Sequence, residues 1–124
     1  MLINEYFKEI ESLVDQCIHI VESNLSKDRR SLHIGIIEGR IFFKDESFLN
    51  FIEFENVKEF IEVYKYAYHY QDRNGSLILR YDMAPHRQDI KTFPHHKHIS
   101  PSEVNESSFP NFGQVLDEIV DILP

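Results

Sequence analysis

Side chains that can transfer protons or bind phosphate are concentrated in the third quarter of the chain. Five of the seven histidines and five of the six tyrosines fall between Tyr64 and His98. A hairpin needs only alternating apolar residues and a turn, so folding alone does not explain this concentration. Metal-independent cleavage of RNA needs a base for the 2′-hydroxyl, an acid for the leaving 5′-oxygen and a cation for the phosphorane charge, and His, Tyr, Lys and Arg can supply these roles. The third quarter is therefore the predicted functional region.

We predict a catalytic set that combines histidines with a cation and needs no cofactor. Unperturbed histidine titrates close enough to neutrality to act as acid or base. The predicted catalytic residues are Tyr68, Arg80, His86, His95 and His96. The predicted substrate-binding residues are Lys65, Tyr66, His69, Arg87, Lys97 and His98.

Two other interpretations of these residues stay open. His96 and His98 share one side of an extended segment, so together with His86 or Asp82 they could hold a metal ion. No Cys or Glu stands near them at established metal-motif spacing, so we predict no metal site. Arg80 and Asp82 could instead form a structural ion pair at the edge of the sheet.

The spacing of four tyrosines and of three acidic residues also fits structural roles. The tyrosines at positions 64, 66, 68 and 70 alternate with period two and are expected to line one face of one strand, mainly in the core. A row of aromatics could alternatively stack unpaired bases. The carboxylates of Glu38, Glu53 and Glu55 fit solvated strand faces better than a metal-dependent nuclease site.

The pattern of apolar residues predicts one α+β domain over residues 1–124, an antiparallel β-sheet meander of about five strands with an N-terminal and a C-terminal helix packed on one face. The first helix is expected to begin near Asn4, and Phe112–Leu123 forms the last. Ser23–Ser31 is predicted to be a loop. The predicted strands are Cys17–Glu22, Ser31–Phe43, Phe48–Glu55, Phe60–Tyr70 and Ser76–Asp82.

The register of the last hairpin decides which side chains share a face. The sequence Asp72-Arg73-Asn74-Gly75 is a strong turn signal. A loop with Gly75 in a bulge sets Tyr68 opposite Arg80 and Tyr66 opposite Asp82, whereas a shift of one residue would place Arg80 beside Ala67.

Four prolines between positions 84 and 110 predict an irregular arm with only short extended pieces.

Composition narrows the function classes. The net charge of −8 over 124 residues argues against a protein that coats nucleic acid through phosphate contacts alone. It does not exclude a nuclease, because six Lys and Arg residues fall within the third quarter. The single Cys17 cannot form an internal disulfide, and no signal peptide or membrane-spanning run is visible, so a soluble cytoplasmic protein is expected.

Three segments resemble a known family. The sequence YHYQDRNGSLILRYDMAPHRQDIKTFPHHKHI, the preceding KDESFLNFIEF and the closing FGQVLDEIVDIL are similar to segments of the TumE-like family, over about residues 30–123. The resemblance implies a toxin of a type II toxin–antitoxin pair, neutralised by a cognate helix-turn-helix antitoxin. Met83 replaces the usual Asn of the family and Arg87 replaces the usual second His, which would weaken this copy if that His were catalytic.

Taken together, the residues and the resemblance predict a cytoplasmic toxin that acts on RNA, with an antitoxin and RNA as partners and no membrane association. The alternative is a non-catalytic protein-binding module. In that case the aromatic hairpin and the Pro/His-rich arm would form an interface with a partner chain or with a second copy in a homodimer.

Overall fold

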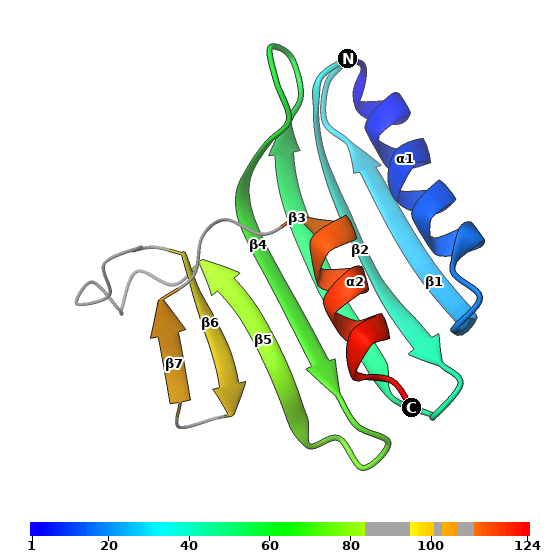
Figure 1. The fold of residues 1–124 in the computed structure, drawn as a ribbon. Coiled ribbons are helices and arrows are strands. Elements are labelled where there is room, and N and C mark those ends of the chain that lie inside the picture. The colour runs from blue at the N-terminus through cyan, green and yellow to red at the C-terminus, as the bar shows by residue number, and fades with distance from the viewer. Residues whose placement is uncertain (84–94, 101–102, 107–110) are drawn as a thin grey trace.

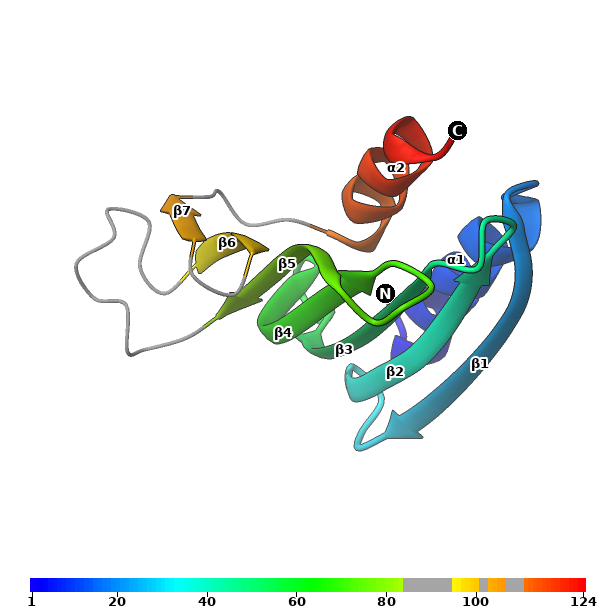
Figure 2. The same ribbon diagram turned by 90° about the horizontal axis from the view of Figure 1, so that it is seen from below.

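A computed structural model describes residues 1–83, 95–100, 103–106 and 111–124, with the two short middle ranges described by their backbone. The described residues form one antiparallel sheet whose seven strands follow each other in sequence order, with both helices on one side (Figures 1 and 2). The elements are α1 (Ile3–Gln16), β1 (Ile20–Arg29), β2 (Ile34–Phe43), β3 (Phe48–Asn56), β4 (Glu62–Gln71), β5 (Leu77–Met83), β6 (His95–Ser100), β7 (Glu103–Glu106) and α2 (Phe112–Ile122). The predicted α+β class is confirmed.

Two predicted features of the sheet need correction. The segment predicted to be a loop after Glu22 is most of β1, which runs to Arg29. Its residues are polar because β1 is an edge strand exposed along most of its length, so alternating apolar residues are not required there. The sheet also gains β6 and β7 within the proline-containing arm, where short extended pieces were expected.

Both helices bury an apolar stripe against the sheet. Helix α1 begins one residue before the expected Asn4, and the Glu5 carboxylate accepts a hydrogen bond of 2.8 Å from the Leu2 backbone N–H. Helix α2 is capped by Asn111, whose side chain accepts from the Gln114 backbone N–H at 2.9 Å. The core joins residues of α1, the sheet and α2, which include Phe7, Ile10, Ile37, Ile41, Phe51 and Phe112.

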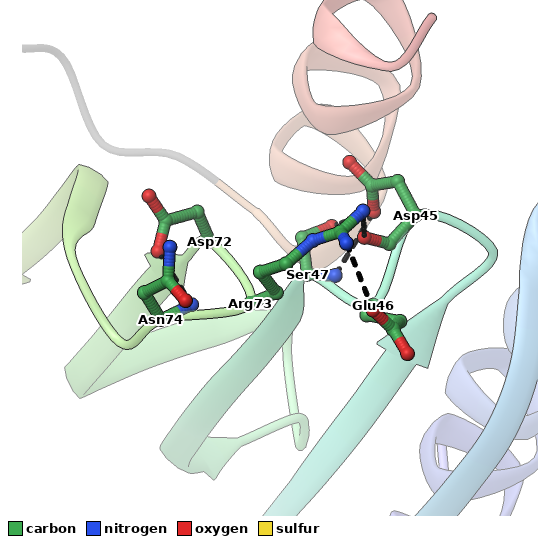
Figure 3. A network of polar contacts seen from close by, with 6 residues as sticks. All are labelled: Asp45, Glu46, Ser47, Asp72, Arg73 and Asn74. Carbon is green, nitrogen blue, oxygen red and sulfur yellow. Dashed lines mark hydrogen bonds and ion pairs between the residues drawn. The ribbon is translucent and has the colours of Figure 1, made fainter.

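The turn between β4 and β5 has the predicted chemistry. Gly75 adopts a φ of 84°, a left-handed conformation that favours glycine. The Asp72 carboxylate accepts hydrogen bonds from the backbone N–H groups of Asn74 (2.8 Å) and Ser76 (3.0 Å). Figure 3 shows that Arg73 links this turn to the β2–β3 turn, with its Nη1 lying 3.3 Å from Glu46 Oε2. The two turns therefore support each other at one end of the sheet.

The register of β4 and β5 differs from both predicted alternatives. Next to the turn, Gln71 pairs with Leu77, as the turn predicts. Ile78 then forms a bulge that shifts the ladder by one residue, so that His69, and not Tyr68, lies opposite Arg80. Asp82 lies opposite Ala67, and the prediction that Tyr66 faces Asp82 is wrong for the same reason.

A second bulge changes the predicted row of tyrosines. Tyr66, Tyr68 and Tyr70 are buried on the face that the helices cover. The register between β3 and β4 shifts between Phe54 and Glu55, which leaves Tyr64 without a direct partner in the ladder. Tyr64 is consequently 45% exposed and does not join the other three.

Candidate functional site

The two faces of the sheet separate the residues predicted to act together. Tyr66 and Tyr68 lie on the helix-covered face with 3% and 0% of their surface exposed. Because neighbouring residues along a strand point to opposite faces, His69 lies on the other, open face, and so does its partner Arg80. The predicted grouping of Tyr68 with Arg80 is therefore wrong, and Tyr66 is too buried to bind substrate.

Tyr68 belongs instead to a buried polar cluster centred on Glu53. The hydroxyl of Tyr68 donates a hydrogen bond to one Glu53 oxygen, and the hydroxyl of Tyr6 donates to the other at 2.6 Å. Burial raises the pKa of Tyr68 well above its usual value, and the nearby Glu53 carboxylate raises it further. Burial also raises the pKa of the Glu53 carboxyl group. The cluster supports the packing of α1 on the sheet.

Glu55 is the second buried carboxyl group on this face. Neither of its side-chain oxygens has a hydrogen-bond partner among the described residues. Burial raises the pKa of Glu55 to about 9, and the neighbouring Glu53 contributes to the shift. The expectation of solvated strand faces is therefore wrong for Glu53 and Glu55, and holds only for the exposed Glu38.

On the open face, the register aligns polar residues from five successive strands. The row runs through Arg40, Asn50, His69, Arg80 and His98, and each member is the direct ladder partner of the next. We call this row the polar row. Residues directly opposite in an antiparallel pair lie close enough to interact. The shifted register thus brings together the predicted residues His69, Arg80 and His98.

A neighbouring row adds charge to the same face. It runs through Glu38, Ile52, Ala67, Asp82 and His96. The Nε atom of Arg80 lies 3.1 Å from Asp82 Oδ2, which confirms the predicted ion pair, although the N–H at Nε lacks hydrogen-bond geometry. The Arg80 side chain remains 42% exposed and Asp82 is nearly buried. Asp82 can therefore orient the guanidinium while part of it stays open to a ligand.

The polar row borders a shallow concavity of about 430 Å³. Its lining includes Glu38, Arg40, Asn50, Ile52, His69 and Arg80. Arg40 is held there by a hydrogen bond of 2.7 Å from its Nε to Asn50 Oδ1. The size is that of a small-molecule or nucleotide site. Arg40 and Asn50 were not among the predicted residues, because only the pairing of β2 and β3 with the hairpin brings these distant positions beside His69.

The remaining predicted residues have different locations. Lys65 lies near the ring of Phe54, with its Nζ 5.2 Å from the ring centroid. In β6, His95 and Lys97 are the ladder partners of Met83 and Tyr81, and they alternate with the positions that join the two rows. His86 and Arg87 lie outside the described residues.

The described residues contain neither a cluster of metal-binding side chains nor a membrane-spanning helix. No group of three His, Cys, Asp or Glu side chains among them is placed to hold a metal ion. No helix among them is long and apolar enough to cross a membrane.

Comparison with known proteins identifies the family. The family model described as Toxin TumE matches residues 10–123. The chain belongs to the TumE toxin family. The resemblance seen in its motifs is thereby confirmed, and membership of a toxin family implies an antitoxin partner in general. No curated protein and no solved structure matches this TumE-family chain.

Proposed function

We propose that this TumE-family toxin acts on RNA and cleaves it at the polar row without a metal ion. The observation that carries the proposal is the alignment of His69, Arg80 and position 98 on adjacent strands of an open sheet face. Adjacent strands lie about 4.8 Å apart, so two histidine positions flank the arginine position at neighbouring-strand distance.

The three positions match the three tasks of RNA cleavage. Arg80 offers a half-exposed guanidinium that can neutralise charge on the phosphorane. A histidine on one side of it serves as the base for the 2′-hydroxyl, and a histidine on the other side protonates the leaving 5′-oxygen. His96, the ladder partner of Asp82, is the next candidate for either proton-transfer role.

The proposal includes a cytoplasmic location and neutralisation by a helix-turn-helix antitoxin. A toxin that cleaves RNA reaches its substrate in the cytoplasm, and a dedicated partner must hold it inactive. We retain His86 and Arg87 as proposed site residues on the basis of the family motif, and Lys65 as a proposed phosphate contact on the basis of its position on the open face.

One observation favours the second candidate function, a protein-binding module. Large apolar residues are exposed at the end of the sheet where α1 begins, and these include Leu2, Leu32, Phe60 and Ile61. Backbone hydrogen bonds of 2.8 Å, from Ile3 N–H to the Leu32 carbonyl and from Val57 N–H to the His33 carbonyl, hold the three segments together. Such a surface suits a partner chain.

Controlled expression in a bacterial host tests the proposed function. Growth and total RNA are followed for the wild type and for Arg80→Ala, Arg80→Lys and His69→Ala. Arg73→Ala is the matched control, because Arg73 is also an exposed arginine in an ion pair but lies at the β4–β5 turn. Thermal unfolding of each purified variant verifies that it folds.

We expect growth arrest with RNA fragmentation for the wild type and for Arg73→Ala. Arg80→Ala and His69→Ala should abolish both effects, and Arg80→Lys should retain part of them because it keeps the charge. Growth arrest with intact RNA would instead favour the protein-binding module. If the folded Arg80→Ala variant still fragmented RNA fully, the polar row would not be the cleavage site.

A further inference from the structure

Two aromatic–cation groups lie along β3 on either side of Asn50, and their aromatic rings take no part in the proposed cleavage chemistry. At the first, the rings of Phe42 and Phe48 lie 6.1 Å apart, and the guanidinium carbon of Arg40 is 5.5 Å from the centroid of the Phe48 ring. Both rings are partly exposed. Partly exposed aromatic rings beside a cation are a common means of holding a nucleic-acid base and its phosphate.

The second group also joins two aromatic rings and a cation, and it lies at the other end of β3. The rings of Phe54 and Tyr64 lie 6.5 Å apart, and Lys65 Nζ is 5.2 Å from the centroid of the Phe54 ring. The β4 bulge creates this group, because it frees Tyr64 from the buried row of tyrosines and leaves Lys65 opposite Phe54. Without the bulge, Tyr64 would point into the core.

The Phe48 and Phe54 rings of the two groups lie on one line, with Asn50 of the polar row between them. Positions 48, 50, 52 and 54 alternate onto the open face of β3. The rise of about 3.3 Å per residue separates Phe48 from Phe54 by roughly 20 Å. Asn50, the β3 member of the polar row, lies within this span. A ligand that contacts both groups must therefore be extended and must pass over the polar row.

We propose that the open face binds single-stranded RNA along β3, with one unpaired base stacked on each aromatic group and phosphates bound by Arg40 and Lys65. This inference rests on the proposed action on RNA and specifies the form of the substrate. A duplex does not fit, because its bases are already stacked on each other and present no free face to the rings. Stacking does not distinguish between bases, so binding tolerates many sequences.

The charge of the open face agrees with this ligand despite the acidic chain. The described cations on or beside it are Arg40, Lys65 and Arg80, and Arg80 is the one paired with a nearly buried carboxylate, Asp82. Glu38 is the acidic residue that lines the concavity. A strand of phosphates can therefore contact Arg40 at one end of this span and Lys65 at the other, while the net charge of −8 disfavours RNA binding elsewhere.

Fluorescence anisotropy with a non-cleavable probe tests the inference. The probe is a 2′-O-methyl RNA dodecamer of mixed sequence, used as a single strand and annealed to its complement. The full-length wild type is compared with Phe48→Leu, Phe54→Leu, Arg40→Ala and Lys65→Ala. The matched control is Phe60→Leu, because Phe60 is 66% exposed but lies in the β3–β4 turn.

We expect the wild type to prefer the single strand, and each leucine variant to raise its Kd by roughly fivefold or more through the loss of one stacked base. Arg40→Ala and Lys65→Ala should each lower the salt slope of binding by about one. Phe60→Leu should bind as the wild type does. Equal binding of duplex and single strand, or leucine variants within about twofold of the wild type, would overturn the stacking inference.

The outcomes separate this inference from the function on which it rests. RNA fragmentation in cells together with unaltered probe binding by both leucine variants would refute only the stacking along β3. An absence of both probe binding and fragmentation for the folded wild type would refute the action on RNA itself.

Discussion

Tyr68 donates a hydrogen bond to the buried carboxyl group of Glu53, on the opposite face of the sheet from Arg80. The sheet therefore carries two separate groups of polar residues, one on each face. The covered face holds buried tyrosines and carboxyl groups, and the open face holds Arg40, His69 and Arg80 around the concavity. This separation makes stability and activity independently testable.

Tyr68→Phe is predicted to weaken the fold but not the chemistry. The change leaves Glu53 with one tyrosine donor, Tyr6, and loss of a hydrogen bond to a buried group costs about 1–3 kcal/mol of unfolding free energy. Chemical denaturation measures the loss, and Tyr64→Phe, at an exposed position, should leave stability unchanged. RNA fragmentation per folded molecule should equal that of the wild type. If Tyr68→Phe left stability unchanged but abolished RNA fragmentation, Tyr68 would have to be assigned to the active site.

Glu55 is predicted to make the protein less stable as the pH rises. Its pKa is raised to about 9 in the folded state, so between its unfolded value near 4.5 and about 9 the folded state binds more protons than the unfolded state. Unfolding free energy then falls with rising pH, by up to about 1.4 kcal/mol per pH unit from a single group. The contribution of Glu55 to stability is fully present below its unfolded pKa and is lost as the pH rises to about 9.

The matched variant Glu55→Gln removes this titration while keeping the shape of the side chain. Denaturation midpoints at pH 5, 7 and 9 should fall steeply for the wild type and less steeply for Glu55→Gln, with the residual slope assigned to Glu53. Identical slopes for the two proteins would show that Glu55 is ionised in the folded state.

Gly39 is predicted to be intolerant of any side chain. A Cβ atom there would lie 2.6 Å from Leu25 Cδ2 and 2.7 Å from the Asn24 carbonyl oxygen, and the backbone atom cannot move aside cheaply. Gly39→Ala should therefore destabilise the fold by about 1–3 kcal/mol.

Gly113→Ala is the matched control for this prediction. A Cβ atom at position 113 would meet its nearest neighbours at 3.4 and 3.7 Å, and alanine favours the helix by up to about 1 kcal/mol over glycine. Thermal unfolding should show a lower Tm for Gly39→Ala and an equal or higher Tm for Gly113→Ala. Equal effects of the two changes would mean that Asn24 and Leu25 of β1 do not lie as close to Gly39 as the structure shows.

The sequence predicted what short-range patterns determine. The Asp72–Gly75 turn matches the structure because it depends on a few neighbouring residues. Helix positions followed from the apolar period for the same reason. The part of β1 after Glu22 was predicted to be a loop because an edge strand with little buried surface carries no apolar alternation.

The composition of the polar row could not be predicted because it depends on two bulges. Each bulge shifts a ladder by one residue, and a shift of one residue exchanges every partner across the strands. The turn before β5 gives the correct pairing of Gln71 with Leu77, but Ile78 carries no local signal that it will be left out of the ladder. The partnership of His69 with Arg80, and the exposure of Tyr64, follow only from these shifts.

Cleavage by the purified protein tests the central claim most directly. The substrate is a 5′-labelled single-stranded RNA, and the control is the all-deoxy strand of the same sequence, which lacks the 2′-hydroxyl that the proposed base must deprotonate. The account predicts cleavage of the RNA to 2′,3′-cyclic phosphate ends, no cleavage of the deoxy strand, and a loss of roughly 10²-fold or more in rate for His69→Ala. Intact RNA with the folded wild type, or wild-type rates for both His69→Ala and Arg80→Ala, would contradict it.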